Sequence, residues 1–242
     1  MAYDPNFIPD LAIPLPKLGK SAKQDAFNDG QPINHTRYSL VFNEARGFAI
    51  YTAHNIDGST LPNSGYTNRS FKFDPDVKPN SLQVGNKQGY KGSHNDWDRG
   101  HMVRRLSVSW GNEDVASKAE RESDYYTNIA PQHELLHSRS WGKIEDWMLE
   151  RVREGTQRVS VFTGPVFSPD DPEIVNLPGQ DPVRIPAGFW KILVVKPNDV
   201  MRAAGFLVWQ RDYDSDQPLA FEPVLEQVRL TTIEFLSKLS FE

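Results

Sequence analysis

The sequence predicts an α+β fold with a central, mainly antiparallel sheet flanked by helices. A chain of 242 residues with 38% hydrophobic and 11% aromatic content can bury one sizeable core in a single domain. Runs of β-branched and aromatic residues, which are typical of strands, recur along it. Segments of helical pattern separate only some of these runs. Antiparallel pairing is therefore favoured over the regular alternation of a parallel α/β fold.

Two regions are expected along the chain. Residues 1–36 are rich in Pro, Lys, Asp and Asn and have no clear periodicity, which predicts an N-terminal extended arm on the surface. Residues 37–242 then form the one compact domain. The sequence contains no internal repeat that would divide this domain further.

The domain begins with a predicted β-hairpin. Its strands are the apolar runs Tyr38–Phe42 and Gly47–His54, and Asn43 between them can open a turn. A further strand is expected at Ser70–Phe73, where the Asp74-Pro75 pair ends the run.

Helical and extended patterns alternate in the middle of the chain. Asn112–Ser123 has helical character, and Tyr125–Ile129 resembles a short strand. Pro131 suits the first position of a helix, because a helix leaves that N–H without a partner in any case. The predicted helix runs to about Arg153 and ends before Gly155.

The last third of the chain supplies most of the predicted sheet. Three apolar runs, Arg158–Phe162, Phe189–Val195 and Ala203–Trp209, each suit one of its strands. A closing helix is expected after them, with Thr231 or Thr232 as its N-terminal cap.

Cysteine content and charge narrow the function classes. With no cysteine, neither disulfides nor thiolate zinc sites can form, so any metal must use His, Asn or carboxylate ligands. The net charge of −5 disfavours a protein that coats nucleic acid by bulk charge, but it allows an enzyme with a local basic site. The stretch Lys91–Arg105 is locally positive, although so short a cluster taken alone is more typical of a solvated surface patch. No apolar run is long enough to span a bilayer and Met1–Pro9 lacks a leader pattern, so a cytoplasmic location is expected.

Three short motifs carry the chemistry. Asp98–His101 reads DRGH, Thr127–Gln132 reads TNIAPQ, and a helical segment then bears His137, Trp141 and Glu145 at steps of four. In this order and spacing they resemble the DNA/RNA non-specific endonucleases of the ββα-metal type, whose signature combines a DRGH box, a TNI-x-PQ segment and a W-x-x-[LI]-E helix. The resemblance covers roughly residues 37–240 and implies a ββα-metal active-site motif within the α+β fold.

The resemblance assigns roles to the polar residues of the boxes. His101 matches the general base, and a neutral histidine can take a proton from water near pH 7. Arg99 would contact phosphate or stabilise developing charge, with a structural salt bridge to Asp98 as the alternative. Asn128 matches a position close to the site and is given a supporting role. Trp141 is interpreted as a core residue rather than a platform for base stacking.

The resemblance also implies one divalent metal ion, Mg²⁺ or Mn²⁺. In the family an asparagine holds the ion and a glutamate fixes one of its waters. Glu145 matches that glutamate, whereas His137 stands where the asparagine is expected. Eight helical residues rise about 12 Å, so His137 as direct ligand with Glu145 acting through water fits best. An imidazole ligand would also admit other transition metals. The alternatives are a solvated helix face for Glu145 and a surface histidine at 137.

Two other functions compete with this interpretation. The string His133–His137 reads HELLH, the zinc metalloprotease motif of two histidines one helical turn apart with a glutamate between them. Glu150 or Glu154 could supply its third ligand. The other competitor is a catalytically decayed nucleic-acid or phosphate binder, in which the change at position 137 has abolished the metal site.

We therefore predict a metal-dependent endonuclease that hydrolyses phosphodiester bonds of DNA and RNA with little sequence specificity. The resemblance implies products that carry 5′-phosphates. The expected partners are DNA and RNA substrates and no membrane. A nuclease without an export signal must also be restrained in its own cell, so an inhibitor, an activating partner or delivery by a dedicated secretion system is expected. A homodimer is an assembly to test.

Overall fold

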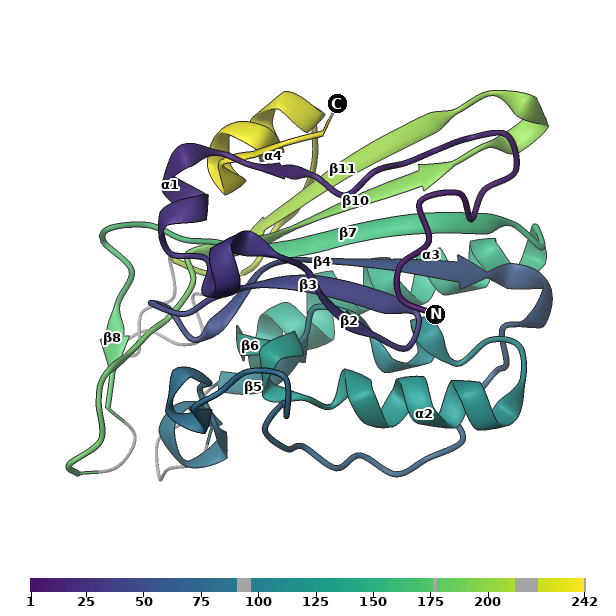
Figure 1. The fold of residues 1–242 in the computed structure, drawn as a ribbon. Coiled ribbons are helices and arrows are strands. Elements are labelled where there is room, and N and C mark those ends of the chain that lie inside the picture. The colour runs from purple at the N-terminus through teal and green to yellow at the C-terminus, as the bar shows by residue number, and fades with distance from the viewer. Residues whose placement is uncertain (91–96, 176–177, 212–221, 242) are drawn as a thin grey trace.

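The computed structural model describes residues 1–90, 97–175, 178–211 and 222–241. Within these residues the centre is a seven-stranded sheet with the order β12-β11-β10-β7-β4-β3-β2, and every neighbouring pair is antiparallel (Figure 1). The predicted fold class is therefore confirmed. The strands are β2 (Ile33–His35), β3 (Tyr38–Asn43), β4 (Phe48–Asp57), β7 (Arg158–Val166), β10 (Gly188–Val195), β11 (Arg202–Trp209) and β12 (Leu225–Val228).

The predicted hairpin and the three later apolar runs form the middle of this sheet. In the β3–β4 hairpin, Tyr38 lies opposite His54, and the Asn43 side chain accepts a hydrogen bond of 2.9 Å from the Arg46 N–H within the turn. The runs predicted as strands coincide with β7, β10 and β11. Their long apolar stretches are explained by burial, because both faces of the central strands are covered by other elements.

The N-terminal residues and α4 (Leu230–Ser237) cover one face of the sheet (Figure 1). Tyr3 and Ile233 of this layer pack into one apolar cluster with Phe162 of β7 and Trp190 of β10. The segment predicted as an arm also contains β2, which is an edge strand of the sheet. Short elements in this layer are β1 (Lys17–Leu18), α1 (Lys20–Gln24) and β13 (Leu239–Ser240), and β1 pairs with β13.

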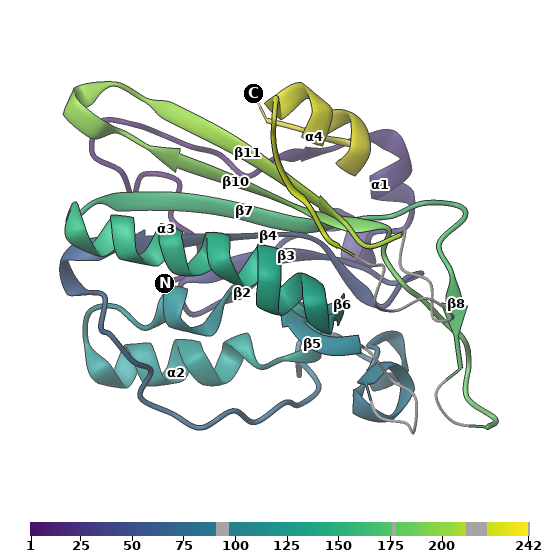
Figure 2. The same cartoon turned by 180° about the vertical axis from the view of Figure 1, so that it is seen from behind.

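The opposite face carries α3 (Gly142–Glu154), which lies along the sheet in Figure 2. Its residues Met148 and Val152 pack with Ile56 and Val161 of the sheet. A separate two-stranded ribbon, β5 (Trp97–His101) with β6 (Ile129–His133), and the helix α2 (Glu113–Ser123) complete this side. The short pair β8 (Glu173–Ile174) and β9 (Val183–Arg184) projects from the end of the sheet (Figure 1).

The helix α2 confirms the helical prediction for Asn112–Ser123. The Asn112 side chain caps it by accepting a hydrogen bond of 3.2 Å from the Val115 N–H. Glu113 and Asp114 occupy its first turn, where negative charge is favourable. No helix in the described part of the chain has both the length and the apolar content to cross a membrane.

Two predictions around the TNIAPQ segment were wrong. Pro131 does not begin a helix: it lies in β6 opposite Arg99, and a two-stranded ribbon tolerates a proline because one side of each strand is unpaired. The helical chain begins only after His133, first as a π-helical turn, Leu136–Trp141, and then as α3. The strand predicted at 125–129 is a 3₁₀ turn over Tyr126–Asn128 that leads into β6.

Two further predictions were wrong. Residues 70–73 form no strand: their backbone is bonded to Asp124, whose carboxylate accepts the Ser70 N–H at 2.6 Å and whose carbonyl accepts the Lys72 N–H at 3.3 Å. The closing helix α4 is capped by Arg229 without a side-chain hydrogen bond, so neither predicted threonine caps it. At residues 70–73 the long-range bonds to Asp124 override the local pattern, and α4 begins at Leu230, before either threonine.

Candidate active site

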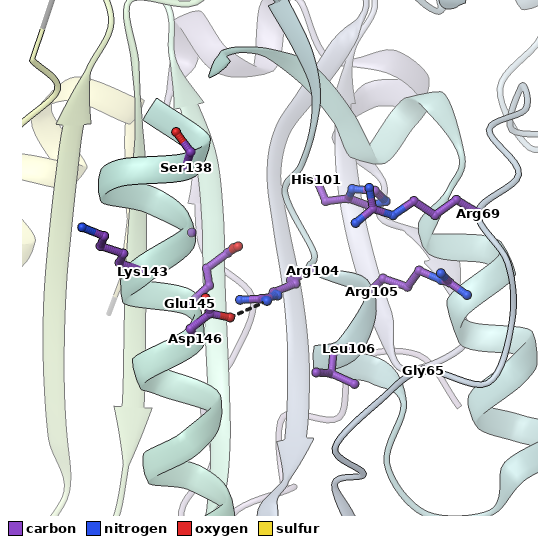
Figure 3. A pocket seen from close by; sticks show the side chains of 11 residues that line it. Gly65, Arg69, His101, Arg104, Arg105, Leu106, Ser138, Lys143, Glu145 and Asp146 are labelled. Carbon is purple, nitrogen blue, oxygen red and sulfur yellow. Dashed lines mark hydrogen bonds and ion pairs between the residues drawn. The ribbon is translucent and has the colours of Figure 1, made fainter. Parts of the chain in front are cut away.

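A polar pocket of about 370 Å³ lies between the end of β5 and the start of α3. Figure 3 shows Glu145 and Asp146 on α3 facing His101 and the arginines that follow it in the chain. The pocket therefore joins two of the three sequence motifs, although they are separated in the chain. Its lining comprises Gly65, Arg69, His101, Arg104, Arg105, Leu106, Ser138, Gly142, Lys143, Glu145 and Asp146.

The DRGH box forms β5, and its glycine is required by the neighbouring strand. Gly100 lies opposite Ala130 in the β5–β6 ribbon. A Cβ atom at position 100 would lie 2.1 Å from Cδ of the Gln132 side chain, which is closer than any real contact. The absence of a side chain at Gly100 thus lets Gln132 of the TNIAPQ box pack across β5. The next residue of β5, His101, then lies at the edge of the pocket.

His101 is held by a buried carboxylate. Its Nε2 lies 3.1 Å from Oδ1 of Asp124, a residue with 0% exposure. Burial lowers the pKa of His101; the hydrogen bond to Asp124 and the charge of that residue raise it, and the pKa remains below its ordinary value. Burial raises the pKa of Asp124, but its hydrogen bonds to His101 and the Ser70 amide outweigh this and leave its pKa lowered. The pair therefore holds a neutral imidazole beside an ionised carboxylate near pH 7.

Asn128 secures the chain that follows His101. Its side-chain oxygen accepts the Val103 N–H at 2.8 Å, and its amide nitrogen donates to the carbonyls of Val103 at 3.0 Å and Ser123 at 2.8 Å. The Met102 N–H also donates to the Asn128 carbonyl at 2.9 Å. With these bonds the buried Asn128 ties the backbone just before Asp124 to the backbone just after His101. These contacts are those of a supporting residue.

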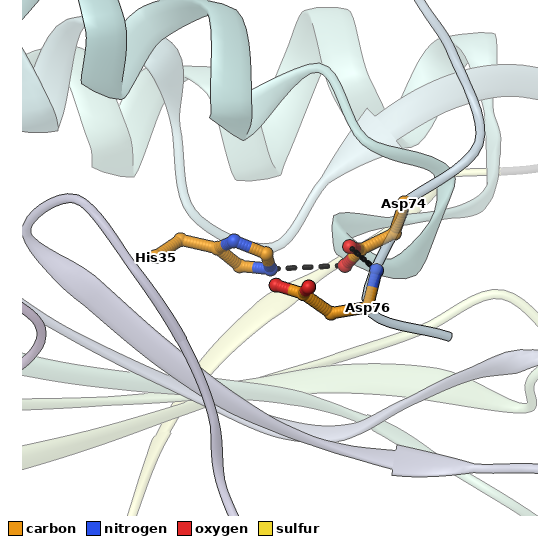
Figure 4. Close-up of side chains that lie close together, drawn as sticks. All are labelled: His35, Asp74 and Asp76. Atoms are coloured by element: carbon orange, nitrogen blue, oxygen red, sulfur yellow. Dashed lines mark hydrogen bonds and ion pairs between the residues drawn. The ribbon is translucent and has the colours of Figure 1, made fainter. Parts of the chain in front are cut away.

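A second buried cluster contacts the 3₁₀ turn Tyr126–Asn128, which contains Asn128. His35 Nε2 lies 2.9 Å from Asp74 Oδ2 (Figure 4). The Thr127 hydroxyl donates to the same oxygen at 2.6 Å. The Asp76 N–H donates to Asp74 Oδ1 at 3.0 Å. Although burial raises the pKa of Asp74, these hydrogen bonds and the charge of His35 leave it lowered. The cluster thus anchors Thr127, the neighbour of Asn128.

His35, Asp74 and Asp76 also form a group whose potential metal-ligand atoms all lie within 4.8 Å of one another. It is a candidate metal site by spacing. However, Asp74 already accepts three hydrogen bonds there, and none of the three residues lines the pocket of His101. We therefore interpret this cluster as structural support for the TNIAPQ segment.

Arg99 lies outside the pocket lining. Its guanidinium donates to the Asn86 side chain at 3.1 Å and lies 4.5 Å from the ring centroid of Phe71. These contacts replace the salt bridge to Asp98 that was the alternative interpretation. Phe71 in turn packs against the His101 ring with a centroid distance of 5.5 Å, so Arg99 borders the site through this aromatic ring.

Four cationic side chains that were not predicted do line the pocket: Arg69, Arg104, Arg105 and Lys143. Arg104 spans to Asp146 of α3 with an ion pair of 2.6 Å, and Arg105 contacts Glu120 of α2 at 2.9 Å. The two arginines lie three and four residues after His101 of the DRGH box, so their position near it was a usable signal. Arg69 had no such signal, because the fold brings it to the site from a distant segment. Within the basic stretch Lys91–Arg105, residues 91–96 lie outside the described residues.

Glu145 forms the opposite wall of the pocket. It is 4% exposed, so the alternative of a solvated helix face is wrong. Its Oε1 lies 2.9 Å from Nζ of Lys191, a residue of β10 that is 1% exposed. Trp141 is fully buried and packs against Phe189 with a centroid distance of 6.2 Å, which confirms that it is a core residue.

The two histidines of the HELLH string do not lie on one helix. His133 belongs to β6, is 3% exposed, and accepts the Leu135 N–H at its Nδ1 with a distance of 3.2 Å. His137 belongs to the π-helical turn before α3, and its side chain lies outside the described part of the structure. The zinc-protease motif requires both histidines on one helical face, and the strand at His133 removes that geometry.

Comparison with known proteins gives the same family as the motifs. The sequence profile of the DNA/RNA non-specific endonucleases matches residues 20–242. The protein y4fB of Sinorhizobium fredii is 34% identical over 236 residues, which are 92% of this chain and 34% of y4fB. Human mitochondrial nuclease EXOG is 29% identical over 222 residues, covering 86% of this chain and 55% of EXOG. The chain thus spans about a third and about half of these two relatives.

More distant similarities agree with this result. Bovine mitochondrial endonuclease G is 25% identical over 228 residues, which are 92% of this chain and 71% of that protein. A crystal structure of an EndoG/EndoGI complex superposes with a TM-score of 0.66 at 20% identity, covering 87% of this chain and 84% of that chain, and it shows a shared fold. The profile match extends over nearly the whole chain and includes all three boxes. This chain belongs to the DNA/RNA non-specific endonuclease family.

Proposed function

We propose that this chain hydrolyses phosphodiester bonds of DNA and RNA with little sequence preference, with one divalent metal ion and with His101 as general base. One observation supports this most strongly: a neutral, carboxylate-held imidazole and a buried glutamate face each other across a pocket lined by cations. Phosphodiester hydrolysis needs a base for water, positive charge at phosphorus and a site for a metal ion. The pocket offers all three kinds of group.

The contact with Asp124 assigns the nitrogen that acts as the base. An ionised carboxylate only accepts hydrogen bonds, so Nε2 of His101 carries the ring proton in the neutral tautomer. The Nδ1 lone pair is then free to take a proton from water. As the water oxygen bonds to phosphorus, its proton passes to Nδ1, the bond from phosphorus to the leaving oxygen breaks, and the resulting imidazolium is stabilised by Asp124.

The cations of the pocket are suited to phosphate oxygens. Arg69, Arg104 and Arg105 bring guanidinium groups to the side of His101, and Lys143 adds a cationic residue to the lining on the α3 side. Such groups bind the phosphate backbone, which is the same for every nucleotide, and so they give affinity without reading base edges. This accounts for low sequence preference in a protein whose net charge is −5.

The donor groups fit a hydrated divalent ion. Glu145 offers a carboxylate oxygen at the pocket wall, the hard type of ligand that Mg²⁺ and Mn²⁺ accept. The Asn128 amide makes three hydrogen bonds within the chain and is not free to serve as a ligand. His137 is proposed as the direct ligand from its place in the motif, with Glu145 holding a bound water. When bound, the ion supplies positive charge at the phosphoryl group and the leaving oxygen.

Assays on one purified sample test this function against its competitors. Plasmid DNA and a transcribed RNA are incubated with Mg²⁺ or Mn²⁺, with and without EDTA, and casein is incubated in parallel. We expect both nucleic acids to be cut into fragments of many lengths only when metal is present, and casein to stay intact. If the protein binds nucleic acid but does not cleave it under any metal condition, the result would favour a catalytically decayed nucleic-acid binder.

A protein inhibitor is the partner with most support. The structural neighbour was crystallised as an EndoG/EndoGI complex, which concerns the inhibition of EndoG. A nuclease of low specificity threatens the nucleic acid of its own cell, so restraint by a bound protein at the pocket is part of the proposal. Cleavage assays with fractions of a host lysate, followed by heat treatment of the inhibiting fraction, test it.

A further inference from the structure

A buried lysine lies behind the metal side of the pocket. Lys191 is in the middle of β10, is 1% exposed, and is paired with Thr163 of β7 and Phe206 of β11 in the sheet register. Its Nζ lies 2.9 Å from Oε1 of Glu145 and 4.8 Å from the ring centroid of Trp141. Lysine is almost never fully buried unless its charge is matched, because desolvation of an ammonium group is costly. This position therefore requires the contact with Glu145.

Glu145 is the counter-ion of Lys191. Among the described residues, the one hydrogen bond of the Lys191 ammonium goes to this carboxylate. The nearby His54 on β4 is fully buried, and its pKa is lowered well below the ordinary value, first by burial and then by the charge of Lys191. His54 is therefore neutral and does not compete as a charged group. The ammonium and the carboxylate form one coupled unit across the interface of α3 and the sheet.

We propose that Lys191 is a positioning residue for the metal site, which acts by holding the Glu145 carboxylate in one orientation. A carboxylate has two oxygens, and Lys191 occupies Oε1 from the side of the sheet. Oε2 is then left for the pocket, where it can accept a hydrogen bond from water on the ion. This inference rests on the proposed role of Glu145, and it adds a residue that lies outside all three motifs.

Lys191 has two opposite effects on metal affinity: it orients the Glu145 carboxylate, and its positive charge repels the metal ion. The proposal requires the first effect to be the larger. A positive charge close to a cation site weakens cation binding by itself, so loss of Lys191 would strengthen binding if charge alone decided. Without Lys191, however, the buried carboxylate loses the partner that holds Oε1 and is free to change its side-chain conformation. A fixed ligand outside the direct coordination sphere typically contributes about ten- to a hundredfold to metal affinity. Weaker binding after removal of Lys191 is therefore the expected result.

The test measures Mn²⁺ affinity by titration calorimetry in the absence of nucleic acid, on the wild type, Lys191→Met, Lys191→Arg, Glu145→Gln and the double variant Lys191→Met/Glu145→Gln. Lys118→Met is the matched control, because Lys118 is an exposed lysine on α2 that pairs with Glu122 at 3.6 Å, away from the pocket. Urea unfolding of each variant in EDTA shows whether the pair is coupled without metal.

We expect Lys191→Met to weaken Mn²⁺ binding by about tenfold or more, and Lys191→Arg to retain most of the affinity. The double variant should bind no more weakly than Glu145→Gln alone, because Lys191 acts through that carboxylate. In EDTA the double variant should be more stable than Lys191→Met, since its glutamine leaves no unpaired charge.

Three outcomes would overturn the proposal: unchanged or tighter Mn²⁺ binding by Lys191→Met, losses that add in the double variant, or equal stability of Lys191→Met and the double variant. If Lys191→Met does not fold, weaker Mn²⁺ binding by the double variant than by Glu145→Gln, or a loss of affinity in Lys191→Arg as large as in Glu145→Gln, would still overturn the proposal. Wild-type Mn²⁺ affinity in Glu145→Gln is a different result, because it would remove Glu145 from the proposed function itself.

Discussion

Nε2 of His101 lies 3.1 Å from Oδ1 of Asp124, and this contact determines which ring nitrogen can act as a base. The carboxylate is fully buried, so the contact is not weakened by solvent. Burial alone would make His101 a weak base by lowering its pKa, and Asp124 restores part of its basicity while fixing the ring. The first two predictions address the two members of this pair.

His101→Ala should remove nearly all cleavage, by about a hundred- to ten-thousandfold, because the variant lacks the group that takes the proton from water. Folding and Mn²⁺ affinity should stay close to those of the wild type, since His101 is not proposed as a ligand. The measurement is the rate of plasmid cleavage at saturating Mn²⁺, with circular dichroism as the folding control. Wild-type rates in this variant would exclude His101 from the mechanism.

Asp124→Asn should lower kcat/KM by about a hundredfold or more, because an amide can donate to Nε2 and so favour the wrong tautomer. The rate of the wild type should rise with pH as His101 loses its proton, at a pH below the ordinary histidine value. In the variant this rise should move to still lower pH, since Asp124 no longer raises the pKa of His101, while Arg69 still lowers it and Glu145 still raises it. Cleavage rates of both proteins from pH 4.5 to 9 test the loss of rate and the shift of the pH dependence. A pH profile of the variant with the same midpoint and the same maximum rate as the wild type would contradict the prediction.

His54 makes stability dependent on pH. The pKa of this buried residue is well below normal, so between pH 6.5 and that lower value the unfolded chain binds a proton that the folded chain does not. The free energy of unfolding should therefore fall on acidification below pH 6.5, by up to about 1.4 kcal/mol per pH unit for this one proton.

The variant His54→Leu should flatten this dependence by one proton without loss of stability at pH 7, because neither ring nitrogen has a hydrogen-bond partner among the described residues. Urea unfolding at half-unit steps from pH 7.5 to 5 measures it. Some slope should remain, since the pKa of His101 is lowered as well. A slope identical to that of the wild type would show that His54 titrates normally.

Cleavage should fall steeply with salt and depend little on sequence. The pocket cations would contact phosphates, and each such contact releases a bound counter-ion. Arg104→Ala should weaken binding about equally for all sequences and reduce the slope of log affinity against log salt by about one. Binding of random-sequence duplexes between 50 and 300 mM NaCl provides the test, with Lys118→Met as control. A preference for particular bases that persists at every salt concentration would disagree with backbone recognition.

His137→Asn should restore the amide ligand typical of the family. An imidazole favours transition metals and must lose a proton before it binds, whereas an amide does neither. The variant should remain active, use Mg²⁺ relatively better than Mn²⁺, and bind metal with a flatter dependence on pH. Paired titrations with both ions at pH 6 and 8 measure this. Identical metal preference in both proteins would mean that His137 is not a ligand.

The sequence was sufficient for what depends on local patterns. The apolar runs of β7, β10 and β11 required strands, and the DRGH and TNIAPQ boxes turned out to be adjacent strands of one ribbon. Pro131 was wrongly predicted to begin a helix, because its preference for the start of a helix is weaker than the pairing of β6 with β5. The TNIAPQ segment is fixed by side-chain bonds from Thr127 and Asn128, which a local rule does not include.

The residues that escaped sequence analysis act over long separations. Lys191 sits within an apolar run and contacts Glu145, 46 residues away in the chain. Asp124 lies 23 residues after His101 and precedes the box that was recognised. Each is a single charged residue without a repeating pattern, so only the three-dimensional fold identifies its partner.

Lys191 also bears on how the chain selects its strand alignment. Neighbouring residues of a strand point to opposite faces, and Trp190 and Ile192 pack into the apolar cluster beneath the N-terminal layer. A slip of β10 by one residue against β7 would turn the ammonium into that cluster and leave Glu145 alone. Such a misfolded state would contain two unmatched buried charges, a large penalty. The pair that orients the metal-site glutamate therefore also discriminates against misaligned folds, and a neutral replacement should fold to a less uniquely defined sheet.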